Sequence, residues 1–276
     1  MIKHYALLSL AVLSVSSASI FVVLANAPGS VTAFWRLFFS VLILLAFTRS
    51  IRTPKRSEVV YPIVAGTALA IHFSSWMQSL FYASVAVSTT IVCTHAIFSA
   101  VFSSFFGERP KLSQVIGVVI AIVGVYFLSG ADPSSKPEGI ILALVGALAG
   151  GVYFTLGRFS RSKIDFESYV LFTYATAALV SFAISYLIKL PLFGYPLKTW
   201  IFFVLLAAIP MMLGHTLINY LLRRMKVVPV TASIIGEAVG AAFLAWIVLG
   251  QALDAKAYLS MILVLFGIGI AVRTQE

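Results

Sequence analysis

Two charged side chains stand inside long apolar stretches of this sequence, and they are the residues best suited to do chemistry. Arg36 lies in the stretch 30–47, and Glu237 lies in the stretch 230–249. An ionisable group is costly in the hydrocarbon layer of a membrane, so such residues are functional candidates by default. The carboxyl group of Glu237 suits proton exchange or cation binding. The planar guanidinium of Arg36 suits contact with a carboxylate at two points.

Both charges also have a structural interpretation. Glu237 could pair with Arg36 or join two helices by a hydrogen bond, and Arg36 could pair or extend its head to the membrane surface. Arg36 is about six residues, or roughly 9 Å at the helical rise, from one end of its stretch. Glu237 is at a similar depth from the opposite end of the membrane. We therefore expect both side chains near the middle of the membrane.

Uncharged polar residues complete the candidate set. His72, Trp76 and Ser79 share one helical face by their spacing, and His215 and Asn219 fall on the equivalent face of a later stretch. The candidates for a substrate or coupling cavity are Glu237, Arg36, His72, Trp76, Ser79, Thr94, His95, His215, Asn219 and Tyr153. The histidines could equally be neutral, hydrogen-bonded groups in helix contacts. No pair of them has a metal-ligand spacing such as H-E-x-x-H, so we expect neither a metal nor a cofactor.

The composition indicates a membrane protein that positions these residues on helices. Hydrophobic residues make up 61% of the chain and charged residues 10%, against about 25% charged residues in soluble domains. A helix that crosses the hydrocarbon layer needs about 20 apolar residues. Ten stretches qualify, namely 5–24, 30–47, 59–81, 83–106, 112–129, 139–156, 168–188, 200–222, 230–249 and 257–272. Helices are expected because lipid offers no partner to an unpaired backbone amide.

The net charge of +10 is explained by orientation in the membrane. Of the 19 lysines and arginines, 14 fall on the side that carries both termini, four fall on the other side, and Arg36 lies within a span. Positive residues collect in cytoplasmic loops, so we expect cytoplasmic termini and no nucleic-acid partner. The single cysteine, Cys93, excludes a disulfide within the chain.

The chain contains an internal repeat. A shift of 143 positions places His72 on His215 and Gly124 on Gly267, without a gap from 72–130 to 215–273. We therefore divide the chain into a first five-helix repeat at 1–131, a linker at 132–138 and a second repeat at 139–276. Because five is odd, the second repeat must enter the membrane upside down. The expected fold is all-α, with ten transmembrane helices as two inverted repeats, an architecture that suits alternating access to a site near the midplane.

Glycines at four-residue spacing predict close helix contacts within this fold. They form the pairs Gly146/Gly150 and Gly236/Gly240, and the second pair brackets Glu237. Small residues at this spacing let two helix backbones approach each other in a membrane.

Three motifs resemble the EamA type of the drug/metabolite transporter superfamily over essentially the full chain. They are Ala33-Phe34-Trp35-Arg36-Leu37, then Ser88-Thr89-Thr90 leading to Phe106-Gly107-Glu108-Arg109, and then Thr231-Ala232-Ser233-Ile234-Ile235-Gly236-Glu237 leading to Leu249-Gly250-Gln251. The resemblance implies ten helices, cytoplasmic termini and a central cavity for a small polar metabolite, often an exported amino acid or related compound. The family often has proline where this chain has His95 and Ala238, and glutamate in place of Gln251. The sequence therefore carries no proline signal for a helix break at either position.

These observations predict a secondary transporter in the plasma membrane that exports a small polar metabolite by alternating access. A proton is the candidate coupling ion. A passive facilitator or channel is the nearest alternative. An integral-membrane enzyme is a more distant one, because the chain has neither G-x-S-x-G nor H-E-x-x-H nor a phosphate-binding G-x-x-x-x-G-K-[ST] motif.

Overall fold

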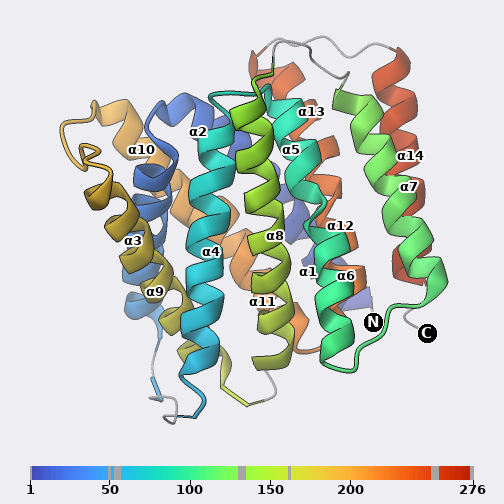
Figure 1. Ribbon diagram of the computed structural model, residues 1–276, viewed down its shortest axis with the longest axis horizontal. Helices are drawn as coiled ribbons and strands as arrows, with labels where there is room; N and C mark the ends of the chain where they lie inside the picture. Colours follow the sequence, from blue (N-terminus) through green and yellow to red (C-terminus); the bar gives the residue numbers. More distant parts are fainter. Residues whose placement is uncertain are drawn as a thin grey trace.

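The structure is a computed structural model that describes residues 2–48, 51–52, 57–129, 135–160, 163–249 and 255–273. Gly250 and Gln251, which end the third motif, lie outside the described residues, as do residues 132–134 of the predicted linker 132–138. The described residues form ten helical spans (Figure 1).

The first half of the chain contributes five of these spans. They are α1 (Ile2–Val15) with α2 (Ala18–Ala25), then α3 (Gly29–Phe47), α4 (Val60–Ser79), α5 (Val85–Cys93) with α6 (His95–Phe105), and α7 (Leu112–Ser129).

The second half contributes the other five. They are α8 (Pro137–Ser160), then α9 (Phe166–Leu187), then α10 (Leu197–Leu206) with the π-helix η1 (Ala207–Thr216) and α11 (Leu217–Leu222), then α12 (Val227–Ile234) with α13 (Gly236–Leu249), and α14 (Ala255–Arg273). Within the described ranges, nine segments are long and apolar enough to cross a membrane. The tenth, α7, is a shorter apolar helix that packs along α14.

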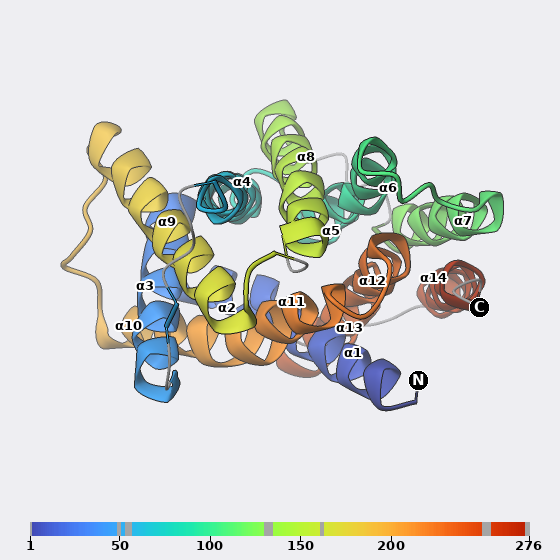
Figure 2. The same cartoon turned by 90° about the horizontal axis from the view of Figure 1, so that it is seen from below.

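The two halves run through the bundle in opposite directions. Helix α1 begins and α14 ends at the same end of the bundle, which we call the termini end, whereas α8 begins at the opposite end (Figure 1). Seen from the termini end, α7 and α14 form one edge and α3, α9 and α10 form the other, with α1, α8, α11 and α12 between them (Figure 2). The all-helical fold with two inverted repeats is thus confirmed.

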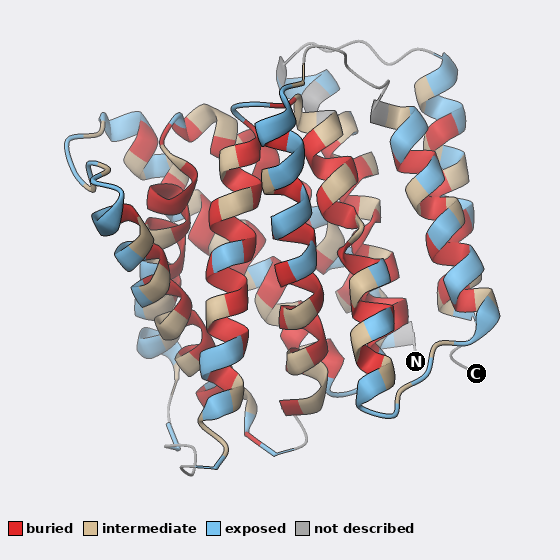
Figure 3. Ribbon diagram, viewed as in Figure 1, coloured by how far each residue is buried: buried red, intermediate tan, exposed pale blue. Residues whose placement is uncertain are grey.

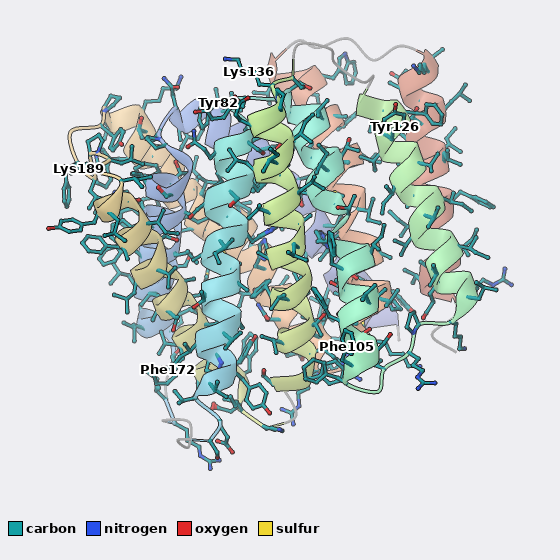
Figure 4. The ribbon with its side chains drawn as sticks, viewed as in Figure 1. Tyr82, Phe105, Tyr126, Lys136, Phe172 and Lys189 are labelled. Carbon is teal, nitrogen blue, oxygen red and sulfur yellow. The ribbon has the colours of Figure 1, made fainter. Side chains whose placement is uncertain are left out.

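The outer surface of the bundle is apolar, as lipid contact requires. Val119 on α7 is 47% exposed and Phe266 on α14 is 61% exposed, and the buried residues face the interior (Figure 3). Side chains that can reach the polar interface mark the opposite end, where Tyr82, Tyr126, Lys136 and Lys189 are found (Figure 4). Tyrosine and lysine are favoured at that depth because each has an apolar body and a polar tip.

Close packing between helices depends on glycine at the points of contact. A Cβ atom on Gly117 of α7 would lie 2.6 Å from the carbonyl oxygen of Gly267 on α14. The predicted pair Gly146/Gly150 packs α8 against His72 and Trp76 of α4, where added Cβ atoms would lie 2.9–3.3 Å from α4 atoms. A Cβ on Gly240 would collide with the hydroxyl group of Ser16. The close contacts expected for both glycine pairs are therefore confirmed.

Four spans are irregular near their middles, which the continuous stretches of the sequence do not indicate. The first span is interrupted at Ser16 and Ser17, the fourth at Thr94, and the ninth at Ile235, while the eighth adopts the π-helix η1. The hydroxyl groups of Ser16 and Thr94 bond to carbonyl oxygens of Val12 and Ile91 at 2.8 and 2.6 Å, and such bonds compete with regular helix geometry. Two of the breaks therefore arise at hydroxyl-bearing residues, without proline.

The π-helix has a different local cause. Pro210 lies inside η1, and proline removes a backbone donor and clashes with the preceding turn. π-Helical turns occur frequently at functional sites. The four irregular segments surround the centre of the bundle, where the candidate residues lie.

Candidate functional site

A small central cavity collects six of the ten candidate residues. Its volume is about 20 Å³, and its lining consists of Arg36, His72, Trp76, His95, His215 and Glu237 together with Val15, Ala18, Phe73, Val92, Phe154 and Ile234. A cavity of this size holds about one water molecule, whereas sites for small molecules are typically several hundred Å³. The structure therefore represents a conformation closed around the site.

Arg36 is fully buried in this cavity without a polar partner. Its exposed fraction is 0%, and none of its three side-chain nitrogens has a hydrogen-bond partner among the described residues. The guanidinium carbon lies 4.0 Å from the centre of the Phe73 ring, so the ring face partly stabilises the charge. The alternatives in which Arg36 reaches the membrane surface or pairs with Glu237 do not match this geometry.

Glu237 faces the same cavity from the first turn of α13. A carboxylate at a helix N-terminus is stabilised by the partial positive charge of that terminus. The helix starts there because the ninth span breaks at Ile235, so the break creates a helix terminus inside the bundle. Glu237 and Arg36 share the cavity, and the structure brings them together as the sequence predicts. Among the described residues, no ion pair and no hydrogen bond joins the side chains of Glu237 and Arg36.

The three candidate histidines surround the two charges. The His72 Nδ1–H donates to the carbonyl oxygen of Gly146 at 2.7 Å. His95 packs against Phe154 with ring centres 5.0 Å apart, and His215 packs edge-on against Phe73 at the same distance. The Nδ1 atoms of His95 and His215 are buried and have no partner within the described part of the chain. Two imidazoles and one guanidinium thus line the cavity with unused hydrogen-bonding capacity.

Asn219 and Tyr153 lie in a separate polar layer between the cavity and the termini end. The Asn219 side-chain amide donates to the Tyr153 hydroxyl and to the carbonyl oxygen of His215. Tyr174 on α9 shares a hydrogen bond of 3.1 Å with Thr216. Neither of these two residues is among the ten candidates predicted from the sequence. This layer, made of Tyr153, Tyr174, Thr216 and Asn219, borders the cavity, since the Tyr153 ring lies 5.9 Å from that of His215.

Ser79 and Thr94, like Asn219 and Tyr153, do not line the cavity. The Ser79 hydroxyl donates to the carbonyl oxygen of Trp76 or to Ser88, and so joins α4 to α5. The Thr94 hydroxyl donates to the carbonyl oxygen of Ile91 within its own span. Helical spacing alone placed Ser79 with His72, but the contact between α4 and α5 takes up its side chain.

An ion pair outside the candidate set links the two halves at the termini end. Arg158 Nη2 lies 3.1 Å from Glu108 Oε1. Glu108 Oε2 also accepts from the backbone amide of Val227, which begins α12, at 3.0 Å, and Arg158 donates to the carbonyl oxygens of Leu222 and Arg223. We call this set, with Glu108 and Arg158 at its centre, the inner latch. The Gly107-Glu108 turn in the second motif was its only sequence signal.

The described residues contain no group of three or more histidine, cysteine, aspartate or glutamate side chains able to hold a metal ion. The chemistry of the cavity is that of one guanidinium, one carboxyl group and three imidazoles. Such a set binds charged or polar solutes by hydrogen bonds.

Comparison with known families decides the class of protein. The model of the EamA-like transporter family matches residues 2–130 and again residues 137–273. The chain belongs to the EamA-like transporter family. The protein is therefore a multi-pass membrane transporter rather than an enzyme, and the resemblance carried by the three motifs is confirmed.

Individual relatives of this EamA-like transporter agree. An uncharacterized transporter of Archaeoglobus fulgidus is 23% identical over 93% of this chain and 92% of its own. Another from the same organism is 34% identical over 30% of each chain. The uncharacterized inner membrane transporter YedA of Escherichia coli K12 is 32% identical over 24% of this chain and 23% of its own. A crystal structure with 20% identity superposes with a TM-score of 0.80 over 98% of this chain and 96% of its own, which supports the fold.

Proposed function

We propose that this EamA-like transporter is a secondary transporter that exports a small polar metabolite, an amino acid or a related compound, by alternating access. The observation that carries the proposal is the buried guanidinium of Arg36, which has no polar partner among the described residues and faces Glu237 across the cavity. A buried charge without a partner is strongly unfavourable. A bound carboxylate would satisfy it.

Glu237 takes the second role. Its carboxyl group can bind a substrate ammonium group or take up and release a proton during the cycle, because burial disfavours the charged form whereas the Arg36 guanidinium in the same cavity favours it, and a bound carboxylate would offset the Arg36 charge. Binding would then be coupled to protonation through the Arg36 charge. A proton is accordingly the proposed coupling ion, and the neighbouring histidines supply polar contacts.

The closed cavity and the inner latch fit an alternating-access cycle. A site for a metabolite must expand well beyond about 20 Å³. The polar layer around Asn219 and the Glu108–Arg158 pair hold the termini end shut. Because the halves are inverted repeats, a rocking motion of one against the other can exchange which end is open.

The orientation follows from charge. Most lysines and arginines lie at the termini end, so we assign this end to the cytoplasm. A plasma-membrane location agrees with the name of the Escherichia coli relative, an inner membrane transporter.

Counterflow in proteoliposomes tests the proposal. Thermal-shift screening of purified protein against amino acids, nucleosides, sugars and polyamines first identifies a ligand, which raises the melting temperature by binding the folded state. Vesicles preloaded with that ligand should then accumulate labelled ligand transiently, with saturable kinetics. A passive channel would show no accumulation and no saturation, and that result would overturn the proposed mechanism. Stabilisation by nucleosides or sugars but by no amino acid or related compound would overturn the substrate class.

A further inference from the structure

A groove far larger than the central cavity opens on the lipid-facing side of the bundle. Its volume is about 900 Å³, and it shares no lining residue with the cavity. Helix α4 separates the two, since His72 and Trp76 face the cavity whereas Ile71 and Ser75 face the groove. A ligand in the groove would therefore not contact the residues that line the cavity.

The groove exists because α4 and α9 touch at one end and separate at the other. Near the termini end, Gly66 of α4 packs so closely on α9 that an added Cβ would collide with the backbone of Thr173. Toward the opposite end, α9 leans away from α4 (Figure 1). The start of α3 forms the floor there. It is fixed to α4 by a hydrogen bond of 2.8 Å from the Gly29 amide to Gln78 Oε1.

The walls of the groove are apolar and open toward lipid. Ile71, Ile141 and Ile188 line it and are 36%, 60% and 60% exposed. From Ile71 to Gln78 the groove extends along α4 by seven residues, or roughly 10 Å at the helical rise, and it continues past the end of α4 to Phe81 and Tyr82. The helical part alone is about a third of the ~30 Å hydrocarbon layer, so the groove lies within the leaflet at the opposite end.

The lining of the groove becomes more polar from its deep end to its mouth, just as a phospholipid becomes more polar from its acyl chains to its headgroup. The deep end at Ile71 and Ile184 is apolar. One to two turns nearer the mouth, Ser74, Ser75 and Gln78 face the groove. The hydroxyl oxygen of Ser74 is buried and has no hydrogen-bond partner within the described structure, so it is free to donate to a ligand. An ester carbonyl of a lipid offers the acceptor that this hydroxyl lacks.

One acidic residue lines the mouth of the groove, and two lysines lie outside its lining at the same end of the bundle. Glu138, exposed in the first turn of α8, lines the groove. Lys136 and Lys189 are exposed at the same end of the bundle (Figure 4). Lys136 is anchored there, because its backbone amide donates to the carbonyl oxygen of Tyr82 at 2.9 Å. A headgroup with a phosphate for the lysines and an ammonium group for Glu138 complements this pattern.

We propose that the groove binds one phospholipid of the leaflet at the opposite end, with its acyl chain along Ile71 and Ile141. Its headgroup is zwitterionic with a primary ammonium group, as in phosphatidylethanolamine. The bound lipid fills the wedge between α4 and α9. This site lies apart from the transport cavity and does not rest on the proposed substrate.

Native mass spectrometry of the full chain tests the site. The detergent-purified protein is exposed to phosphatidylethanolamine, phosphatidylcholine and phosphatidylglycerol with identical acyl chains. We expect one retained phosphatidylethanolamine per chain, at least about fivefold above the other two lipids, a preference of roughly 1 kcal/mol. Equal retention of the three lipids, or preference for phosphatidylglycerol, would overturn the headgroup assignment.

Variants locate the site. Ile141→Trp fills the groove from an exposed position and should abolish specific retention. Leu148→Trp, on the same helix but outside the groove and 46% exposed, should retain lipid like the unchanged protein. Glu138→Gln should reduce the preference for phosphatidylethanolamine over phosphatidylcholine. Ile184→Trp, on the opposite wall, serves as a second blocking variant if Ile141→Trp elutes as aggregate. Full lipid retention by a folded blocking variant would refute the groove as the site.

Discussion

The rings of His72 and His215 lie 6.4 Å apart at the centre of the bundle. The two residues are equivalent positions of the internal repeat, 143 residues apart. Equivalent residues of an inverted repeat meet only near the pseudo-two-fold axis. The axis therefore passes through the cavity that contains Arg36 and Glu237. The bonding around it is unequal, because His72 donates to Gly146 while His215 Nδ1 has no partner among the described residues.

Glu237→Gln should remove the pH dependence of transport. The amide keeps the shape of the side chain but cannot exchange a proton. With a ligand identified as above, the ratio of uptake at two pH values either side of neutrality should fall to about one, while ligand binding in a thermal-shift assay persists. An unchanged pH profile would remove the proton role of Glu237 and leave the cavity assignment intact.

Arg36→Lys should weaken the binding of a carboxylate ligand although the charge is kept. Lysine lacks the planar fork that contacts two oxygens at once. We expect the apparent KM to rise about tenfold, which corresponds to ~1.4 kcal/mol. A ligand analogue without its carboxylate should bind the unchanged protein and the variant equally. Full transport with an unchanged KM would argue that Arg36 does not touch the substrate.

Glu108→Gln should open the termini end more often, because it removes the ion pair with Arg158. Cys93 reports this opening without any engineered probe. It is the single cysteine of the chain, it is fully buried, and it lies beside the break at Thr94. We expect alkylation of Cys93 by a maleimide to accelerate several-fold in the variant.

Glu167→Gln is the matched control for this prediction. Glu167 is an exposed glutamate in the first turn of α9, at the same end of the bundle. Its substitution should leave the alkylation rate unchanged. Equal rates in all three proteins would contradict a role of the inner latch in closure.

Gly267→Val should destabilise the protein through the contact between α7 and α14. An added Cβ would lie 2.6 Å from the carbonyl oxygen of Gly117, which cannot move without separating the helices. Overpacking of this kind costs about 1–3 kcal/mol. Gly269→Val, two residues later on the same helix, meets open space and should change the melting temperature little. Equal melting temperatures for both variants would refute this packing.

Much of the fold could be predicted because lipid imposes simple rules. Apolar length predicted the ten spans, and the odd number of spans per repeat predicted their inversion. The meeting of Arg36 and Glu237 followed from their depths. It was harder to predict which residues line the cavity. One helical face, such as that of His72 and Ser79, can contact two neighbouring helices, and Ser79 bonds to Ser88 of α5 instead of facing the cavity.

The other three helix breaks and the inner latch were beyond sequence reasoning, whereas Pro210 inside the stretch 200–222 marks the site of η1. The breaks at Thr94 and Ile235 occur without proline at those positions. Thr94 bonds to the carbonyl oxygen of Ile91, and the backbone amide of Ile235 bonds to that of Ala232, contacts that the residue types alone do not specify. Glu108 and Arg158 are ordinary loop and helix-end charges until the fold brings them within 3.1 Å. Their pairing depends on how α8 meets the turn before α12, which no local pattern encodes.

The π-helix η1 makes the two halves unequal where equality would matter most. The residues of α4 that correspond to Ala207–Thr216 form an ordinary α-helix. Two identical halves would give inward-open and outward-open forms of equal energy. In the alternating-access cycle proposed above, the proline-bearing π-helix in one half would make the energies of these two forms unequal even without substrate. The preferred resting form would then depend on the eighth span.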